Sequence, residues 1–267
     1  GVVAAFRQSL GYFPQLGENS FTLKYYLEIL SDRELQISLL LTIILTAVVT
    51  VISAICGVAL ALFLRPLVRK SSLVSSLLQI PIALPHLAAA AVLIHFISSS
   101  GLISRICYAF GLIETPADFP VLINDGYGIG IILAYLLKET PFVALVVLAV
   151  LARVDDQFTE VARNLGATAW QRFRFVTLPL IMPSVIFSSL IVFAFVFGAF
   201  EVPQILGRPF PAMIAVVANR RFGDTNLAER PSAMAIVIVM FLISIILVWF
   251  YLRLTEKTKV AEKPTVF

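Results

Sequence analysis

Long apolar runs separated by short polar connections make up most of this sequence. A helix needs roughly 20 mostly apolar residues to cross a hydrocarbon core about 30 Å thick. The four runs that reach this length without any Asp, Glu, Lys or Arg are 37–64, 71–104, 175–200 and 231–252. A fifth run, 127–152, is apolar except for Lys138 and Glu139. Because the runs are continuous rather than alternating, they predict helices and not barrel strands. We expect an all-α, polytopic transmembrane helical bundle with five spans in this chain.

Composition and charge support a membrane protein and exclude other classes. The chain is 60% hydrophobic and 13% charged, with a mean hydropathy of +0.97. Its formal net charge is +4, but the basic residues lie at span ends rather than on one soluble face, so nucleic acid is not an expected partner. Cys56 falls inside a predicted span and Cys107 in a connection, so no disulfide framework is expected.

The distribution of Lys and Arg among the connections predicts the orientation. Eleven lie on one set of connections and eight on the other, and the short 65–70 turn is half basic. Basic residues in short loops mark the cytoplasmic side, so residue 1 is expected outside and the C-terminus inside. The expected organisation is an outer N-terminal connection over 1–35, a transmembrane domain over 36–254 with a cytoplasmic loop at 153–179, and a cytoplasmic tail over 255–267.

Prolines and surface patterns add local detail to this plan. Pro81 and Pro85 should kink or break the 71–104 span, and Pro141 should kink the fifth run. A short amphipathic piece, Leu23 to Leu30, is predicted to lie along the membrane surface. The segments 105–126 and 202–230 are expected to form outer loops.

The predicted cytoplasmic loop reads as two short helices joined by a glycine turn. Asp155 or Asp156 can cap the first helix, and Thr168 can cap the second. Gly166 sits where a helix end favours a residue that tolerates a positive φ. Leu178 and Pro179 then open the next span, since proline in a first turn loses no hydrogen bond. The first helix carries an apolar stripe at positions i, i+3, i+4 and i+7, formed by Phe158, Val161, Ala162 and Leu165.

The same loop carries a motif with fixed spacing. It reads Glu160-Val161-Ala162, three residues, Gly166, nine residues, then Val176-Thr177-Leu178-Pro179. This resembles the EAA signature of binding-protein-dependent ABC importer permeases: Glu-Ala-Ala, x3, Gly, x9, Ile-x-Leu-Pro. Val161 and Val176 depart from the signature but stay apolar. The residues Phe200-Glu201-Val202-Pro203 are similar to permeases of the spermidine/putrescine, iron and thiamine importer group.

The resemblance implies a type I importer transmembrane domain in a bacterial inner membrane. In that family the loop holds a coupling helix that docks on a separate ATPase. By resemblance, that interface contains Phe158, Glu160, Val161, Ala162, Leu165 and Gly166, with Leu178 and Pro179 as structural motif residues. The implied partners are ABC ATPase subunits, a second permease subunit, identical or related, an extracytoplasmic solute-binding protein and the lipid bilayer. From periodicity alone, an ordinary amphipathic re-entry loop packed on its own bundle is the preferred explanation of the stripe, and the resemblance reverses that preference.

The sequence contains no machinery for hydrolysing ATP. No Gly-x4-Gly-Lys-[Ser/Thr] string and no nucleophile–base pair occurs. We therefore expect a chain that is not an enzyme and binds no cofactor, with ATP and Mg²⁺ on the partner ATPase. His86 and His95 have no Cys, Asp or Glu beside them on their apolar span, so no metal site is expected.

Charged residues at membrane depth are the remaining candidates for the transport path. Lys138 and Glu139 lie mid-span, and adjacent helical residues point about 100° apart, so both cannot face one groove. One of them lines the path, or both pair with neighbouring helices or with the partner permease. Glu201 is expected to end a span over 180–201, either as a gate residue or as an interfacial charge.

Two further alternatives stay open at this stage. A secondary transporter or channel would work without an ATPase and should show inverted repeats with broken helices in both halves, whereas only 71–104 looks broken here. A five-span protein with its N-terminus outside fits the charges, but permeases resembling this chain commonly carry a preceding helix. We therefore expect six spans in the intact protein.

Overall fold

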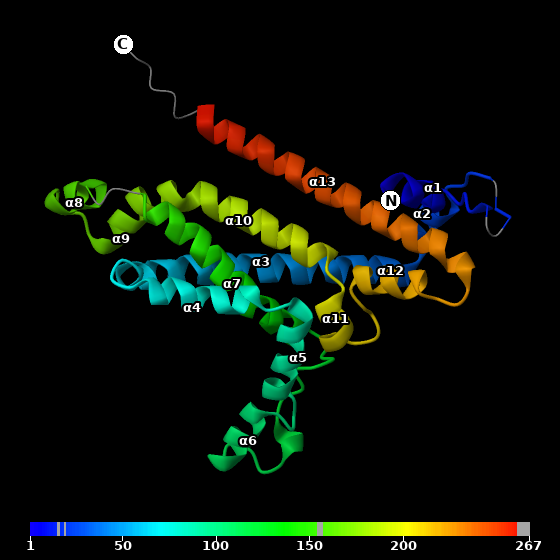
Figure 1. Cartoon of the computed structure of the whole chain (residues 1–267), viewed down its shortest axis with the longest axis horizontal. Helices are drawn as coiled ribbons and strands as arrows, with labels where there is room; N and C mark the ends of the chain where they lie inside the picture. The colour runs from blue at the N-terminus through cyan, green and yellow to red at the C-terminus, as the bar shows by residue number, and fades with distance from the viewer. Residues whose placement is uncertain (15–16, 19, 154–156, 261–267) are drawn as a thin grey trace. The chain divides into compact units, whose positions relative to one another are not determined.

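The structure is a computed structural model of the 267-residue chain, and it describes residues 1–14, 17–18, 20–153 and 157–260. The described residues are predominantly helical (Figure 1). Five of the described helical segments are long and apolar enough to cross a membrane. These are Arg33–Val68, His86–Ala109, Ile129–Leu151, Ala169–Gly198 and Leu227–Trp249. The predicted all-α class with five spans is confirmed.

Contacts divide the chain into two compact units, and each is described by itself. The first comprises 1–47, 86–134 and 194–267, and the second comprises 48–85 and 135–193. The first contains α1 (Val2–Ser9), α2 (Lys24–Ser31), the start of α3 (Arg33–Val68), α5 (His86–Ile97), α6 (Leu102–Ala109), α11 (Glu201–Leu206), α12 (Ile214–Phe222), α13 (Arg230–Val260) and two 3-10 turns, Pro116–Asp118 and Leu227–Glu229. The second contains the rest of α3, α4 (Ser72–Ala83), most of α7 (Ile129–Leu151), α8 (Gln157–Asn164), α9 (Ala169–Arg172), a π-helical turn (Phe173–Thr177) and most of α10 (Leu178–Gly198).

In the first unit, α13 is the helix on which α1, α2 and α12 pack (Figure 1). Small buried residues, Ala215 and Ala218 on α12 and Ala233 on α13, suit close helix approach in a membrane, where packing rather than water exclusion drives association. Arg221 of α12 holds α2 in place through an ion pair of 2.7 Å with Glu28.

In the second unit, α3 and α7 pack closely at a glycine. A Cβ added to Gly57 would lie 2.6 Å from the Cβ of Val143, so only glycine fits without a shift. Ala144 and Val147 of α7 are also fully buried. The predicted kink proline of this helix, Pro141, lies inside the assigned α7 without interrupting it.

The predicted 71–104 span is corrected in its details. It is two helices, α4 and α5, with the break at Leu84 and Pro85, whereas Pro81 lies within α4. Leu84 is extended, with φ −69° and ψ 136°, as expected for a residue before proline, because the proline ring crowds the helical conformation. The apolar helical run long enough to span is 86–109, which includes α6 and so extends into the predicted outer loop 105–126.

The structure also changes three parts of the predicted organisation: the N-terminal connection, the tail and the outer loop 202–230. The expected outer connection 1–35 contains α1 and α2, and α3 already begins at Arg33. The amphipathic piece at Leu23–Leu30 is confirmed as a helix, α2. The predicted tail is helical up to Val260, because α13 continues past its apolar part, and 261–267 lie outside the described residues. The predicted outer loop 202–230 holds α12 and most of α11.

Candidate functional site

The motif segment forms a short helix, a glycine turn and a second helix, as predicted. α8 lies beside α9 near the N-terminal end of α10 (Figure 1). Val161 on α8 and Leu165, in the turn that follows the helix, are exposed, and Leu165 is 82% exposed. The backbone of Phe158 belongs to α8, but its side chain lies outside the described part of the structure. The predicted caps Asp155 and Asp156 lie outside the described residues altogether. The described members of the predicted stripe therefore form an uncovered apolar edge.

The turn explains the spacing of Ala162 and Gly166. Gly166 has φ +82°, and its N–H donates to the carbonyl of Arg163 at 3.0 Å. The N–H of Ala167 donates to the carbonyl of Ala162, also at 3.0 Å. This pair of bonds is the Schellman ending of a helix, in which the left-handed residue is usually glycine. Ala162 accepts the outer bond of this cap through its backbone carbonyl, and Gly166 supplies the left-handed residue.

The second helix begins with a reciprocal cap. The N–H of Gln171 donates to the Thr168 hydroxyl at 3.3 Å, and the N–H of Thr168 donates to the Gln171 side chain at 2.8 Å. Arg172 adds a bond of 2.8 Å from its guanidinium to the carbonyl of Ala167. Because these bonds satisfy donors at the start of α9, the turn between the two helices has a defined geometry.

The prediction of a separate second helix is wrong in one respect. α9 continues through the π-helical turn into α10, so that 169–198 is one helical run. Pro179 has no N–H for the carbonyl four residues before it, and the preceding N–H, of Leu178, reaches back five residues to Phe173. Leu178 begins α10, with Pro179 in its first turn, as predicted.

A groove opens between these elements. It has a volume of about 370 Å³ and is lined by Ala162, Leu165, Gly166, Ala167, Gln171, Arg172, Phe175 and Val176. Trp170 and Phe175 are largely exposed as well. The charged residues Glu160, Arg163 and Arg172 flank this apolar surface. An exposed apolar groove with a charged rim is suited to receive part of another protein.

Lys138 is buried at the break between α4 and α5. It is 4% exposed, and its ammonium donates to the carbonyl of Leu84 and, at 3.4 Å, to that of Ile82. These carbonyls lie where α4 ends, and the last carbonyls of a helix have no partner within their own helix. Glu139 is 7% exposed. This geometry matches the packing alternative for Lys138, and a role in the transport path stays a prediction for both residues.

The expected position of Glu201 is corrected. α10 ends at Gly198, and Glu201 is the first residue of α11 and is exposed. Pro203 lies in the first turn of α11, where a proline loses no helical hydrogen bond. A role for Glu201 as a gate is untested.

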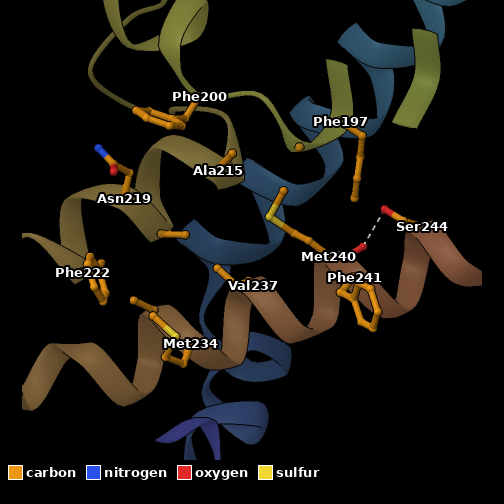
Figure 2. A pocket seen from close by; sticks show the side chains of 13 residues that line it. Phe197, Phe200, Ala215, Asn219, Phe222, Met234, Val237, Met240, Phe241 and Ser244 are labelled. Carbon is orange, nitrogen blue, oxygen red and sulfur yellow. Dashed lines mark hydrogen bonds between the residues drawn. The ribbon is translucent and has the colours of Figure 1, made fainter. Parts of the chain in front are cut away.

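A second hollow, which no sequence motif indicated, lies in the first unit. It has a volume of about 450 Å³ and lies between the end of α10, α12 and α13. Figure 2 shows aromatic and methionine side chains, among them Phe197, Phe222 and Met240, gathered there from these helices. Asn219 and Ser244 are its polar members, and Asn219 donates to Gln204 at 3.2 Å. The lining residues are spread over 197–244, so only the folded chain brings them together.

Comparison with known proteins identifies the family. The model of the binding-protein-dependent transport system inner membrane component matches residues 51–260, which include the whole motif segment. The chain belongs to this family. It is a multi-pass protein of the inner membrane, and the resemblance noted from the motif is confirmed. The family is a class of transport components.

Individual relatives agree with this assignment. The chain is 28% identical over 155 residues to the spermidine/putrescine transport system permease protein PotB of Haemophilus influenzae, covering 58% of this chain and 52% of PotB. It is 27% identical over 241 residues to the trehalose/maltose transport system permease protein MalF of Thermococcus litoralis, covering 86% of this chain and 78% of MalF. The chain spans about half the length of several of the curated relatives it matches.

Solved structures share the fold. A chain of a bacterial alginate ABC transporter, crystallised with a periplasmic protein bound to an alginate pentasaccharide, matches with a TM-score of 0.77 at 20% identity. The match covers 97% of this chain and 87% of that chain. A chain of the MetNI methionine ABC transporter matches with a TM-score of 0.54 at 16% identity.

Proposed function

We propose that this chain is the transmembrane permease subunit of an ATP-binding-cassette importer that is coupled to its ATPase through the 156–170 loop. The observation that carries the proposal is the exposed apolar edge of α8 beside the groove. The glycine turn connects this edge to α9, the start of the helical run 169–198 that includes a membrane span. A second permease subunit, two ATPase subunits that bind ATP and Mg²⁺, and an extracytoplasmic solute-binding protein complete the complex. The transported solute is small and is delivered by that binding protein.

The geometry of the loop supports this coupling role. Because the Schellman turn and the Thr168 cap fix α8 against α9, a force applied to α8 reorients α9. α9 passes without a break into α10, so the displacement reaches the membrane-embedded part of the chain. A rigid element that transmits a shift in this way is what a two-state transporter needs to switch between inward- and outward-facing states.

Co-purification with an affinity-tagged chain tests the proposal directly. Wild-type protein should retain a soluble ATPase, and Leu165→Glu should lose it, since the substitution places a charge in the proposed apolar contact. Leu112→Glu is the matched control, because Leu112 is also highly exposed but lies in the predicted outer segment. Equal retention by both variants would count against the interface.

The same preparations test the alternative of a secondary transporter or channel. Reconstituted complex should hydrolyse ATP faster when loaded binding protein is added, since a partner that prefers one conformation shifts the population toward it. Solute flux through the purified chain alone, driven only by a gradient, would favour a channel or secondary transporter.

A further inference from the structure

The hollow between the end of α10, α12 and α13 is lined mainly by apolar side chains (Figure 2). Its volume of about 450 Å³ falls within the roughly 300–1,000 Å³ that is typical of ligand pockets. The Asn219 amide donates to Gln204 at 3.2 Å, and the Ser244 hydroxyl donates to the carbonyl of Met240 at 3.0 Å. The donors of both polar lining residues therefore already bond to the protein, and a polar ligand would find few partners.

The charges around the hollow disfavour an ionic ligand. None of the described residues that line it is charged, so the lining offers no carboxylate to a cation. A cation can also bind over an aromatic ring, but the Arg230 guanidinium already lies 5.2 Å from the centre of the Phe222 ring. An unpaired buried charge is costly, whereas an apolar cavity stays dry and accepts apolar molecules. The lining therefore selects an apolar ligand.

The hollow lies at the depth of the membrane spans. Phe197 belongs to the candidate span Ala169–Gly198. The lining residues of α13 belong to the candidate span Leu227–Trp249. In a multi-pass membrane protein, the medium around such segments is lipid hydrocarbon and not water. An apolar ligand that is always present at this depth is the acyl chain of a lipid.

The hollow opens on an apolar side of α13. Val237 and Phe241 line it and are 43% and 51% exposed. Ile245 and Val248, which are 46% and 40% exposed, lie four and seven positions after Phe241, so they continue the same side of the helix. The hollow is thus continuous with an exposed apolar surface along which lipid chains pack.

The arrangement of the lining favours a linear ligand. The lining positions on α13 run from Ala233 to Ser244, which corresponds to roughly 16 Å along the helix. A transmembrane helix of a partner subunit is roughly 10–12 Å wide with its side chains, so it would place only single side chains in the hollow. A flexible chain can instead follow the length of the hollow.

We propose that this hollow binds an acyl chain of a membrane phospholipid, which enters from the exposed side of α13. Methionine and phenylalanine side chains suit such a ligand, because the flexible thioether of methionine adapts to irregular apolar shapes. Recognition is through the chain, so the headgroup does not determine binding. The proposal rests on the membrane location of the chain and not on the ATPase contact, so each can fail without the other.

Photo-crosslinking in lipid nanodiscs tests the proposal. The full chain, alone and with the subunits that co-purify with it, is placed in dioleoyl phosphatidylcholine. A small fraction of the phosphatidylcholine carries a diazirine near the end of one acyl chain, and labelled residues are located by peptide mass spectrometry. Ala215 and Ala218 of α12 are decisive, because they line the hollow but are only 7% and 5% exposed. Lipid at the protein surface scarcely reaches them, so we expect adducts there only if a chain enters.

Two variants of α13 provide the comparison. Val237→Trp places a larger side chain at the partly exposed mouth and should lower the labelling of α12 at least about fivefold, the smaller end of the effect of overpacking. Ile246→Trp is the matched control, because Ile246 is 61% exposed and lies nine positions away, on the opposite side of the helix. It should leave the labelling unchanged. Phosphatidylcholine with its diazirine on the headgroup should not label Ala215 or Ala218.

Three outcomes would overturn the proposal. Absence of adducts at Ala215 and Ala218 in the wild-type chain would show that no acyl chain enters. Equal labelling of α12 in Val237→Trp and Ile246→Trp would remove the proposed entrance. Labelling of the isolated chain that disappears in the complex would assign the hollow to a partner subunit. The comparison of the two lipid probes uses wild-type protein, so the test remains decisive if Val237→Trp does not fold.

Discussion

Gly166 offers the sharpest test of the coupling loop, because its role depends on backbone conformation alone. Its φ is +82°, and a Cβ placed there would meet no atom within 4 Å. Substitution by Ala therefore causes no clash, and its cost is that of holding an L-residue in the left-handed region, about 1–2 kcal/mol. This corresponds to a roughly 5- to 30-fold shift away from the formed turn. Asn tolerates this region better, and Pro cannot adopt it.

The expected order of ATPase retention is Gly, then Asn, then Ala, then Pro. Gly166→Pro also removes the N–H that bonds to Arg163, so the Schellman turn cannot form. The assay is the amount of ATPase recovered with a tagged chain, normalised to membrane-inserted protein. This readout does not require the transported solute to be known.

Gly111 provides a matched control for the same series. It follows α6 with φ +68°, has no atom within 4 Å of a built Cβ, and donates to Tyr108 at 2.9 Å. The next N–H, of Leu112, bonds back to Cys107, so this helix end is also a Schellman turn. Substitutions at Gly111 should cost similar stability and leave the ATPase bound. Full retention by Gly166→Pro, or equal losses at both glycines, would refute the reasoning.

Three further predictions concern packing and topology. Gly57→Ala should lower the free energy of unfolding of the detergent-solubilised protein by about 1–3 kcal/mol, because the new Cβ would overlap Val143. Adding Val143→Gly should recover part of this loss. Arg221→Gln should raise the rate of amide hydrogen exchange in α2, since it removes a partly exposed ion pair that contributes about 1 kcal/mol. An unchanged exchange rate would show that apolar packing alone holds α2. In a variant without the two native cysteines, Thr225→Cys should react with an impermeant maleimide added outside, and Gln171→Cys only with maleimide added inside. The reverse labelling pattern would overturn the predicted orientation.

The sequence was sufficient for features that depend on local chemistry. Apolar length alone located four of the five spans, and the glycine turn with its Thr168 cap followed from rules for helix ends. The Ala162–Gly166 relation is local too, since both residues belong to one set of hydrogen bonds. The glycine after a short helix indicates such a turn, whereas alanine takes part only through its backbone carbonyl.

Features that depend on distant contacts were not predictable in this way. Nothing local distinguishes Pro81, which a helix accommodates, from Pro85, at which the chain breaks. At the break, the ammonium of Lys138, more than 50 residues away, donates to the carbonyls of Ile82 and Leu84. The hollow between α10, α12 and α13 likewise combines segments far apart in the chain. The sequence predicts that Glu201 ends a span over 180–201, whereas α10 ends at Gly198 and a new helix begins at Glu201.

The π-helical turn explains how the helical run 169–198 can include both the polar α9 and the apolar α10. Pro179 cannot donate to the carbonyl four residues earlier, and an ordinary helix would stop or bend sharply there. Because the chain instead inserts a five-residue π turn at Phe173–Thr177, the polar α9 and the apolar α10 remain one helical run. A flexible linker at this point would absorb any displacement of α8. A helical connection passes it on, so the π-helical turn keeps the span mechanically linked to the loop despite the proline of the motif.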